Sequence, residues 1–208
     1  MTYGIRKGEK EHKRSVHIAL MLLCCVFALC CAVFLWNIGE WVYDYCTRST
    51  RYDSCIRNAA YRNHIDPALV KALIWQESRF NRNAKGLKGE IGLMQIMRNY
   101  AVTDWAKVHR RPIPSTGALY DPDLNIEIGS WYLARALSRY QTYRHAVALA
   151  LCEYNAGARR ASDWKPKELS GGVLDRISIP STQAYVKAIL ARYEYYKKEY
   201  KQQGGYKK

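Results

Sequence analysis

The sequence is poor in the residues that build metal and nucleotide sites. Its five histidines are scattered along 208 residues, without the spacing that zinc ligands need. No phosphate-binding loop, nucleic-acid-binding motif or internal repeat is present, and no stretch gives a convincing β-strand pattern. The sequence therefore predicts a helical protein with no metal, no other cofactor and no nucleic-acid partner.

Acidic residues are also scarce. Asp and Glu number 18 against 33 Lys and Arg, which gives a net charge of +15. A basic surface of this kind suits nucleic acid, anionic lipid or an acidic polymer. Because no nucleic-acid motif is present, the charge favours a partner in the cell envelope.

Charged residues are absent altogether from positions 16–36. As a helix, Ile18 to Trp36 would span about 28 Å, close to the thickness of a bilayer core. Five basic and two acidic residues precede this run, which predicts a cytoplasmic N-terminus with the rest of the chain outside. A cleaved signal peptide is the alternative, but no small-residue cleavage site follows the run. We expect one uncleaved anchor.

The seven cysteines form no ligand pattern. Four of them lie in the apolar run as small helix residues. Cys152 lies in an apolar segment and is expected to be a buried thiol. Cys46 and Cys55 follow the predicted membrane segment, where an oxidising compartment permits a disulfide between them.

The stretch from Ile65 to Ile96 carries the strongest local signals. Asp66 is a suitable N-cap and Pro67 suits the first position of a helix. Apolar residues follow at 69, 70, 73 and 74, and the same periodicity reaches Glu77. Burial disfavours a charged carboxylate, so we expect a raised pKa and an acid able to protonate a leaving group. A structural glutamate paired with a nearby arginine is the alternative.

Residues 77–97 resemble the core of the soluble lytic transglycosylase (SLT) domain. The resemblance is carried by Glu-Ser-x-Phe-Asn at 77–81 and Gly-Leu-Met-Gln-Ile-Met at 92–97. Three further motifs follow in the family's order: Asn-Ile-x-x-Gly-x-x-Tyr-Leu at 125–133, Glu-Tyr-Asn-Ala-Gly at 153–157, and Ile-Pro with a later Thr and Tyr-Val at 179–186. The resemblance implies a mostly α, lysozyme-like SLT domain around a glycan-binding cleft, preceded here by one transmembrane helix.

The same resemblance implies a peptidoglycan lytic transglycosylase, which cleaves the glycan strand between N-acetylmuramic acid (MurNAc) and N-acetylglucosamine (GlcNAc). Glu77 would be the catalytic acid, and then the base on the C6 hydroxyl of the same muramoyl sugar. Attack by that hydroxyl leaves a 1,6-anhydro-MurNAc end. The substrate-binding residues implied are Gln95, Tyr154, Met97, Ser78, Asn155 and Glu153.

Several of these residues also have a structural interpretation. The Ser78 hydroxyl can bond its own helix, and Asn155 can hold a turn. Gln95 can hold the glycine loop, which contains Gly86, Gly89 and Gly92. Met97 can belong to the core, and Tyr154 can be a buried structural tyrosine.

Two departures from the family pattern keep other functions open. Gly86 stands where well-known members have a serine that contacts substrate, and Glu153 stands where alanine is common. Glu153 could raise the pKa of Glu77, face solvent, or activate water, and the last would make the protein a lysozyme-like muramidase. A non-catalytic peptidoglycan-binding module is a further alternative, against which the retained Glu77 argues.

The expected organisation is a cytoplasmic basic tail (1–15), a transmembrane anchor (16–38), a linker (39–50), an SLT-like catalytic domain (51–200) and a flexible tail (201–208). We expect a single-pass protein of the bacterial cytoplasmic membrane, with its catalytic domain on the periplasmic side and peptidoglycan glycan strands as substrate. No protein partner is indicated. Helices are expected at 51–63, 66–80, 96–108, 121–137, 143–153, within 155–164, and at 181–200.

Overall fold

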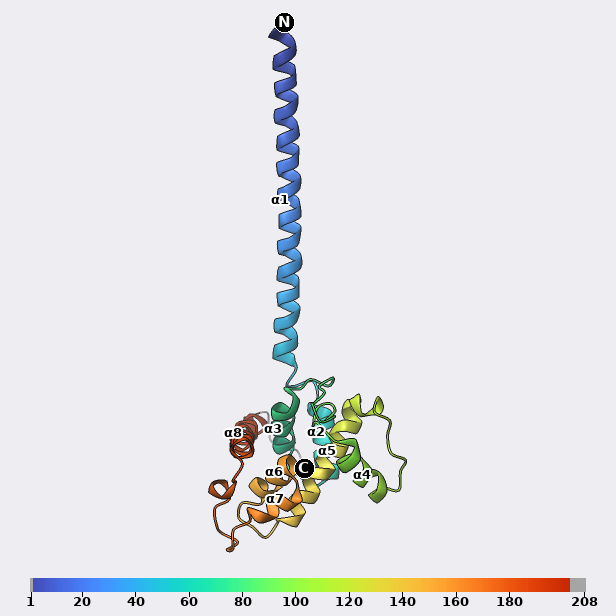
Figure 1. Cartoon of the computed structure of the whole chain (residues 1–208), viewed down its shortest axis with the longest axis vertical. Coiled ribbons are helices and arrows are strands. Elements are labelled where there is room, and N and C mark those ends of the chain that lie inside the picture. Colours follow the sequence, from blue (N-terminus) through green and yellow to red (C-terminus); the bar gives the residue numbers. More distant parts are fainter. Residues whose placement is uncertain (1, 203–208) are drawn as a thin grey trace. The chain divides into compact units, whose positions relative to one another are not determined.

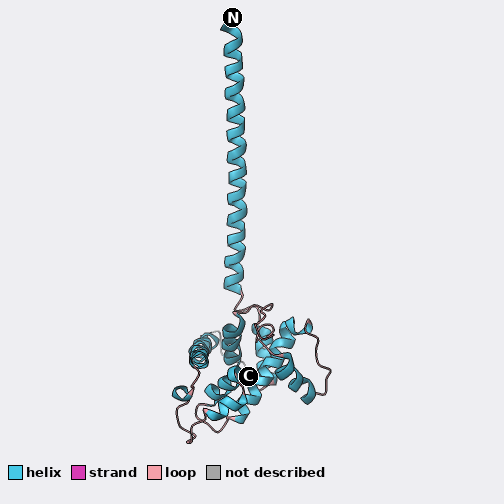
Figure 2. Ribbon diagram, in the orientation of Figure 1, coloured by secondary structure: helices cyan, strands magenta, loops and turns pink. Residues whose placement is uncertain are grey.

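The structure is a computed structural model that describes residues 2–202, with side chains described for 21–44 and 47–202. The described chain is helical throughout its regular parts (Figure 2). Within residues 2–202 the only β-structure is a pair of isolated bridges, Lys85 with Ile91 and Ile91 with Ile96. The chain divides into two compact units, Met1–Arg48 and Ser49–Lys208.

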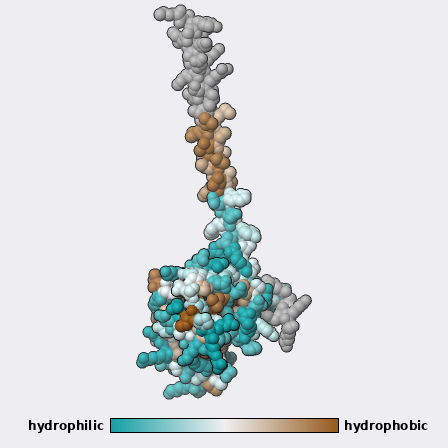
Figure 3. Space-filling model, turned by 90° about the vertical axis from the view of Figure 1, so that its right-hand side faces the viewer, coloured by the Kyte–Doolittle hydropathy of each residue, from teal (hydrophilic) through white to brown (hydrophobic). Residues whose placement is uncertain are grey.

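The first unit is the long helix α1 (Thr2–Thr47; Figure 1). Its segment Met21–Asp44 is 24 residues long and is long and apolar enough to cross a membrane. The large apolar side chains of this segment are exposed, and they form the brown stretch in Figure 3. Apolar surface of this extent is unfavourable in water. Most of the expected linker at 39–50 is helical, and the boundary of the membrane segment stays a prediction.

The second unit contains seven α-helices and three shorter helical turns among its described residues. The α-helices are α2 (Asp53–Arg62), α3 (Pro67–Ser78), α4 (Thr103–Val108), α5 (Pro122–Arg139), α6 (Ala146–Ala156), α7 (Ala158–Asp163) and α8 (Pro180–Gln202). The turns are the π-helical η1 (Arg98–Val102) and the 3-10 turns η2 (Ala118–Tyr120) and η3 (Leu174–Arg176). Residues 203–208 of the expected tail lie outside the described residues.

Two Asp-Pro pairs start helices, as the sequence predicted. The Asp66 carboxylate accepts a hydrogen bond from the Ala68 backbone N–H at 2.8 Å and begins α3. The Asp121 carboxylate accepts one from Leu124 N–H at 3.0 Å and begins α5. Each proline occupies a position where its missing N–H would have had no helical partner, so it costs the helix nothing.

The helix predicted over 96–108 was placed too early. Ile91 and Ile96 exchange backbone hydrogen bonds at 3.1 Å in both directions, which closes a tight turn. Gln95 within the turn has a φ of +46°, and Met97 after it is extended, with φ −100° and ψ 127°, so a right-handed helix cannot include Met97. Helical structure therefore begins only at Arg98, because the apolar run before it is buried in a turn.

Helix α3 is the central helix of the second unit. Every residue from Ala68 to Ile74 is buried, and the helix packs mainly against α8 and also against α2 (Figure 1). A helix that is apolar on all sides belongs in a core. The apolar positions 69, 70, 73 and 74 noted in the sequence thus belong to a helix that is buried on all sides over residues 68–74.

Lys71 is the one charged residue in this buried part of α3. Its ammonium lies 2.9 Å from Asp53 Oδ1 on α2 and 3.3 Å from Glu199 Oε1 on α8. The rings of Tyr196 and Tyr200 lie at 5.0 Å and 5.3 Å, within range of a cation–π interaction. The network joins three helices around a fully buried cation.

The cysteines of the second unit are free thiols. Cys55 is a free thiol. The side chain of Cys46 lies outside the described residues, so the disulfide that the sequence permits stays a prediction. Cys152 is buried in α6, as predicted. Burial raises the pKa of its thiol to about 12, which keeps it unreactive.

Replacing Lys71 with alanine should lower the free energy of unfolding by about 3–5 kcal/mol, because two carboxylates lose the buried cation between them. The matched control is Lys197→Ala, which removes a surface pair with Glu194 and should cost no more than about 1 kcal/mol. Urea denaturation of the full chain in mild detergent, followed by circular dichroism, measures both. Equal losses for the two variants would show that the buried network contributes no special stability.

Candidate active site

Glu77 lies in the last turn of α3 and is only partly exposed. Its Oε1 accepts a hydrogen bond from the hydroxyl of Tyr185 on α8. Because α3 and α8 pack along each other, the packing of these two helices fixes the carboxyl group and its partner together.

Burial raises the pKa of Glu77 from 4.5 to about 7. The hydrogen bond from Tyr185 opposes this rise, because it favours the ionised form. The negative charge of Glu90 adds to the rise. The acid is therefore substantially protonated near neutral pH, as the sequence led us to expect, and it can donate a proton there.

Two buried tyrosine hydroxyls lie close enough to Glu77 to respond to its charge. Burial raises the pKa of Tyr185 and of Tyr154 well above 10, and the charge of Glu77 adds to both shifts. The Tyr154 hydroxyl, on α6, donates to the backbone carbonyl of Met94 at 2.8 Å. Tyr154 thus secures the segment that carries Gln95.

The chain reverses direction directly after α3. Arg79 and Phe80 have φ values of +52° and +62°, and two successive non-glycine residues in this region are strained by about 1–3 kcal/mol each. The Ser78 hydroxyl donates its one hydrogen to the carbonyl of Leu93 at 2.8 Å, and the carbonyl of Ile74 lies within reach of the same hydroxyl at 3.2 Å. Ser78 therefore attaches the returning loop to the helix beside the acid.

The loop is held from α5 by a buried amide. Asn125 Nδ2 donates to the carbonyls of Ile91 at 2.9 Å and Leu119 at 2.8 Å, while its Oδ1 accepts from Met94 N–H at 2.9 Å. Gly92 has a φ of +75°, and a Cβ there would lie 2.9 Å from Asn125 Cγ. Only glycine fits this position without displacing the asparagine.

Gln95 closes the same loop through its side chain. Its Nε2 donates to the carbonyls of Ala84 at 3.2 Å and Gly92 at 3.0 Å. These contacts match the structural interpretation of Gln95, in which its side chain holds the glycine loop. A contact between Gln95 and substrate stays a prediction. Met97, half-buried, follows directly after the turn.

Glu153 and Asn155 each have a partner other than Glu77. Glu153 is only 1% exposed and forms an ion pair with Arg139 of α5. A carboxylate so buried and paired is unavailable to water, so its expected contact with substrate finds no support in the geometry. Asn155 Oδ1 accepts from the Thr182 hydroxyl at 2.8 Å, which joins the end of α6 to the start of α8.

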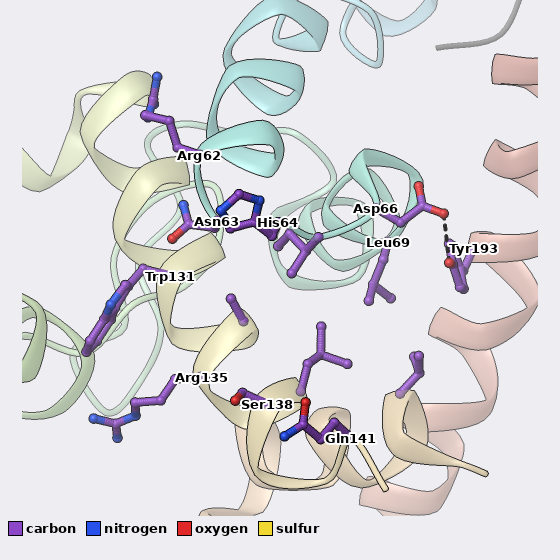
Figure 4. A pocket seen from close by; sticks show the side chains of 14 residues that line it. Arg62, Asn63, His64, Asp66, Leu69, Trp131, Arg135, Ser138, Gln141 and Tyr193 are labelled. Atoms are coloured by element: carbon purple, nitrogen blue, oxygen red, sulfur yellow. Dashed lines mark hydrogen bonds between the residues drawn. The ribbon is translucent and has the colours of Figure 1, made fainter. Parts of the chain in front are cut away.

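A pocket of about 790 Å³ lies near the other end of α3 (Figure 4). Asp66 and Leu69 line it from α3, Trp131 lines it from α5, and Tyr193 of α8 donates a hydrogen bond to Asp66 at 2.8 Å. Asp66 precedes Glu77 by eleven residues, which is about 16 Å along a helix. The pocket is therefore separate from the acid.

No group of three or more His, Cys, Asp or Glu side chains that could hold a metal ion occurs among the described residues. The Glu77 carboxyl instead has a tyrosine hydroxyl, that of Tyr185, as its hydrogen-bond partner.

The sequence did not reveal two residues that act on Glu77. Tyr185 stood in the closing motif, but its partner lies 108 positions earlier, and only the packing of α8 on α3 brings them together. Glu90 lies in the glycine loop, where nothing in its spacing relates it to the acid. Its influence depends on how the loop returns to α3.

Three comparisons with known proteins agree with one another. The model of the Transglycosylase SLT domain family matches residues 54–172. The soluble lytic murein transglycosylase of Escherichia coli (strain K12) is 34% identical over 153 residues, covering 70% of this chain and 23% of that protein. The membrane-bound lytic murein transglycosylase C of Edwardsiella ictaluri is 34% identical over 119 residues, covering 53% of this chain and 32% of that protein.

Solved structures give the same result for the fold. An inactive mutant of the lytic transglycosylase Slt from Pseudomonas aeruginosa superposes with a TM-score of 0.64 at 26% identity, over 72% of this chain and 24% of that one. The 70-kDa soluble lytic transglycosylase in complex with bulgecin A gives a TM-score of 0.63 at 29% identity, over 77% of this chain and 26% of that one. These matches confirm the predicted mostly helical fold.

The chain thus spans only about a quarter to a third of the length of these relatives. The family model nevertheless matches more than half of this chain, and all four motifs that suggested the family from the sequence lie in the helical unit. The chain belongs to the Transglycosylase SLT domain family.

Proposed function

We propose that this chain is a membrane-anchored peptidoglycan lytic transglycosylase that cleaves the β-1,4 bond between MurNAc and GlcNAc. The observation that carries the proposal is the half-buried Glu77, with a pKa of about 7 and a hydrogen bond from Tyr185. Relatives named lytic murein transglycosylases support the activity, and one solved relative is an inactive glutamate-to-glutamine mutant.

In the first step Glu77 acts as the acid. Since Tyr185 donates to Oε1, the acidic proton belongs on Oε2. This proton moves to the glycosidic oxygen as the bond from that oxygen to C1 of the muramoyl sugar breaks. The Tyr185 hydrogen bond stabilises the carboxylate that results, because hydrogen bonds to the charged form favour it.

In the second step the Glu77 carboxylate acts as the base. It takes the proton of the C6 hydroxyl of the same muramoyl sugar while the C6 oxygen bonds to C1. The ring closes as 1,6-anhydro-MurNAc, no water is consumed, and Glu77 is protonated again. The C6 hydroxyl is tethered to the reacting sugar, so its effective concentration exceeds that of a loosely held water.

The burial of Glu153 supports ring closure over hydrolysis, because it removes the carboxylate that the sequence offered for activating water. A non-catalytic binding module is disfavoured by the raised pKa of Glu77, which a purely binding surface does not require. Among the other expected site residues, Gln95 and Met97 are the proposed substrate contacts. We assign Ser78, Tyr154 and Asn155 to positioning.

For the N-terminal part, we propose one uncleaved span of the bacterial cytoplasmic membrane, with the catalytic unit on the periplasmic side. The apolar length of Met21–Asp44 supports a span, although a signal sequence has the same features. The basic residues before the span support a cytoplasmic N-terminus. Relatives named membrane-bound lytic murein transglycosylase C support attachment to a membrane.

Glu77→Gln should lower the rate of peptidoglycan cleavage at least about a hundredfold, because the amide cannot donate the proton. In the wild type, the rate should fall as pH rises through about 7, where Glu77 loses its proton. The matched control is Glu194→Gln, an exposed glutamate of α8, which should keep the wild-type rate. Near-normal turnover by Glu77→Gln, with the fold verified by circular dichroism, would assign the acid to another carboxylate.

Digestion of purified peptidoglycan by the full chain in mild detergent should release 1,6-anhydro-MurNAc ends. Mass spectrometry distinguishes these ends, because each is lighter by one water than the reducing end left by hydrolysis. A digest dominated by reducing MurNAc ends would replace the transglycosylase with a muramidase.

A reporter fused to the C-terminus should be active only outside the cytoplasm, and the intact chain should fractionate with membranes. The physical reason is the excess of basic residues before the apolar run, which retains the N-terminus inside. Release of a shortened soluble protein would identify the run as a cleaved signal peptide instead.

A further inference from the structure

The segment at the end of α4 concentrates exposed positive charge. Residues 107–113 read Lys-Val-His-Arg-Arg-Pro-Ile, and each of them is exposed. No Asp or Glu occurs from residue 105 to residue 120. Among residues with described side chains, no carboxylate forms an ion pair with Lys107, Arg110 or Arg111. These three charges are therefore available to a partner outside the fold.

Two large aliphatic side chains lie among the charges. Val108 is 62% exposed and Ile113 is 45% exposed. The α4 basic surface is defined here as Lys107, Val108, Arg110, Arg111 and Ile113. In Figure 1, α4 and the loop after it lie on the side of the second unit away from α8, and Figure 3 views that side, with hydrophobic patches bordered by hydrophilic surface.

The backbone of this surface is held in one conformation. His109 N–H donates to the Trp105 carbonyl at 3.0 Å, and Arg111 N–H donates to the Ala106 carbonyl at 2.9 Å. The His109 ring stacks on Trp105 with their centroids 4.8 Å apart. Arg110 has a φ of +53°, a conformation that glycine usually adopts after a helix. Strained residues of this kind persist only where the surrounding structure fixes them, so the cations are presented from a defined backbone.

Stabilisation of α4 accounts for only part of this charge. Basic residues in the last turn of a helix interact favourably with its dipole. Helix α4 has six residues, and Lys107 lies in its last turn. The effect falls off within that turn, so it does not explain the two arginines that follow the helix.

The mixture of cations and aliphatic side chains favours a lipid surface as the partner. A glycan or nucleic acid offers negative charge but nothing apolar to Val108 and Ile113. A bilayer offers both, since anionic head groups lie directly above the acyl chains. The chain also keeps the second unit near a bilayer: Asp44 ends the candidate span and Ser49 begins the second unit, and a chain of this length reaches at most about 18 Å.

We propose that the α4 basic surface binds anionic lipid head groups, so that the catalytic unit contacts the membrane at a second place besides its covalent anchor. The three cations pair with head-group phosphates, while Val108 and Ile113 enter the head-group region. The proposal rests on the proposed membrane span for the tether and does not depend on the cleavage reaction.

The first test is methyl NMR of the full chain in lipid nanodiscs that contain a little lipid with a spin-labelled head group. In discs of phosphatidylcholine and phosphatidylglycerol in equal parts, the spin label should broaden the methyl signals of Val108 and Ile113. The methyl signals of Leu169, which is 51% exposed in the loop after α7, give the reference and should broaden less. In discs of phosphatidylcholine alone, the signals of Val108 and Ile113 should fall to that reference level.

A charge-removing variant tests the cations. Each basic residue near an anionic surface favours the bound state about fivefold, so Lys107→Gln/Arg110→Gln/Arg111→Gln should lower the ratio of bound to free unit at least about tenfold. The matched control is Arg159→Gln/Lys167→Gln/Lys198→Gln, which removes the same charge from exposed positions outside α4 and should keep the wild-type broadening. Equal losses in the two variants would show that net charge alone acts and would overturn the assignment to this surface.

The remaining outcomes separate this proposal from the proposed function. Signals of Val108 and Ile113 that broaden no more than those of Leu169 in the anionic discs overturn lipid binding. The same holds if soluble peptidoglycan fragments shift these signals and the anionic discs do not, because the surface then binds glycan. Release of a shortened soluble protein overturns the membrane span alone. Sedimentation of that protein and its charge-removing variant with phosphatidylglycerol vesicles then decides whether the α4 basic surface binds lipid.

Discussion

A half-buried carboxyl group at the end of α3 is the constraint on which the rest of the candidate site depends. Removing a carboxylate from water is costly, so Glu77 retains its proton to a pKa of about 7. Tyr185 limits this effect by stabilising the ionised form through a hydrogen bond. Burial and the Tyr185 hydrogen bond thus act on the pKa of Glu77 in opposite directions, and burial is the larger of the two.

This balance requires that α3, α8 and the glycine loop keep fixed positions. The buried Lys71 joins α3 to α2 and α8, and its ion pair with Glu199 lies between the same two packed helices that place Tyr185 against Glu77. The loop is held from three directions, by Ser78 of α3, Asn125 of α5 and Tyr154 of α6. Most polar residues of the family motifs thus serve to position the loop and helices around the acid.

Local signals in the sequence predicted the elements that local chemistry controls. The Asp-Pro pairs start α3 and α5 where they were expected, since an N-cap and a proline act within one helical turn. The helix predicted over 96–108 was placed too early for a physical reason. Ile91 and Ile96 pair across a turn containing Gln95 in a left-handed conformation, and a short apolar run gives no indication of such a turn.

The sequence by itself determined the family, the helical class and the apolar N-terminal segment, and it pointed to Glu77 as the candidate acid, because each depends on the order and spacing of neighbouring residues. The tertiary structure decided which side chains surround that acid. It placed Tyr185 against Glu77 across 108 positions and buried Glu153 beside Arg139. It also folded Glu90 over Gly86. Hydrogen bonds, ion pairs and burial depend on distances in space, and packing between helices far apart in the chain sets those distances.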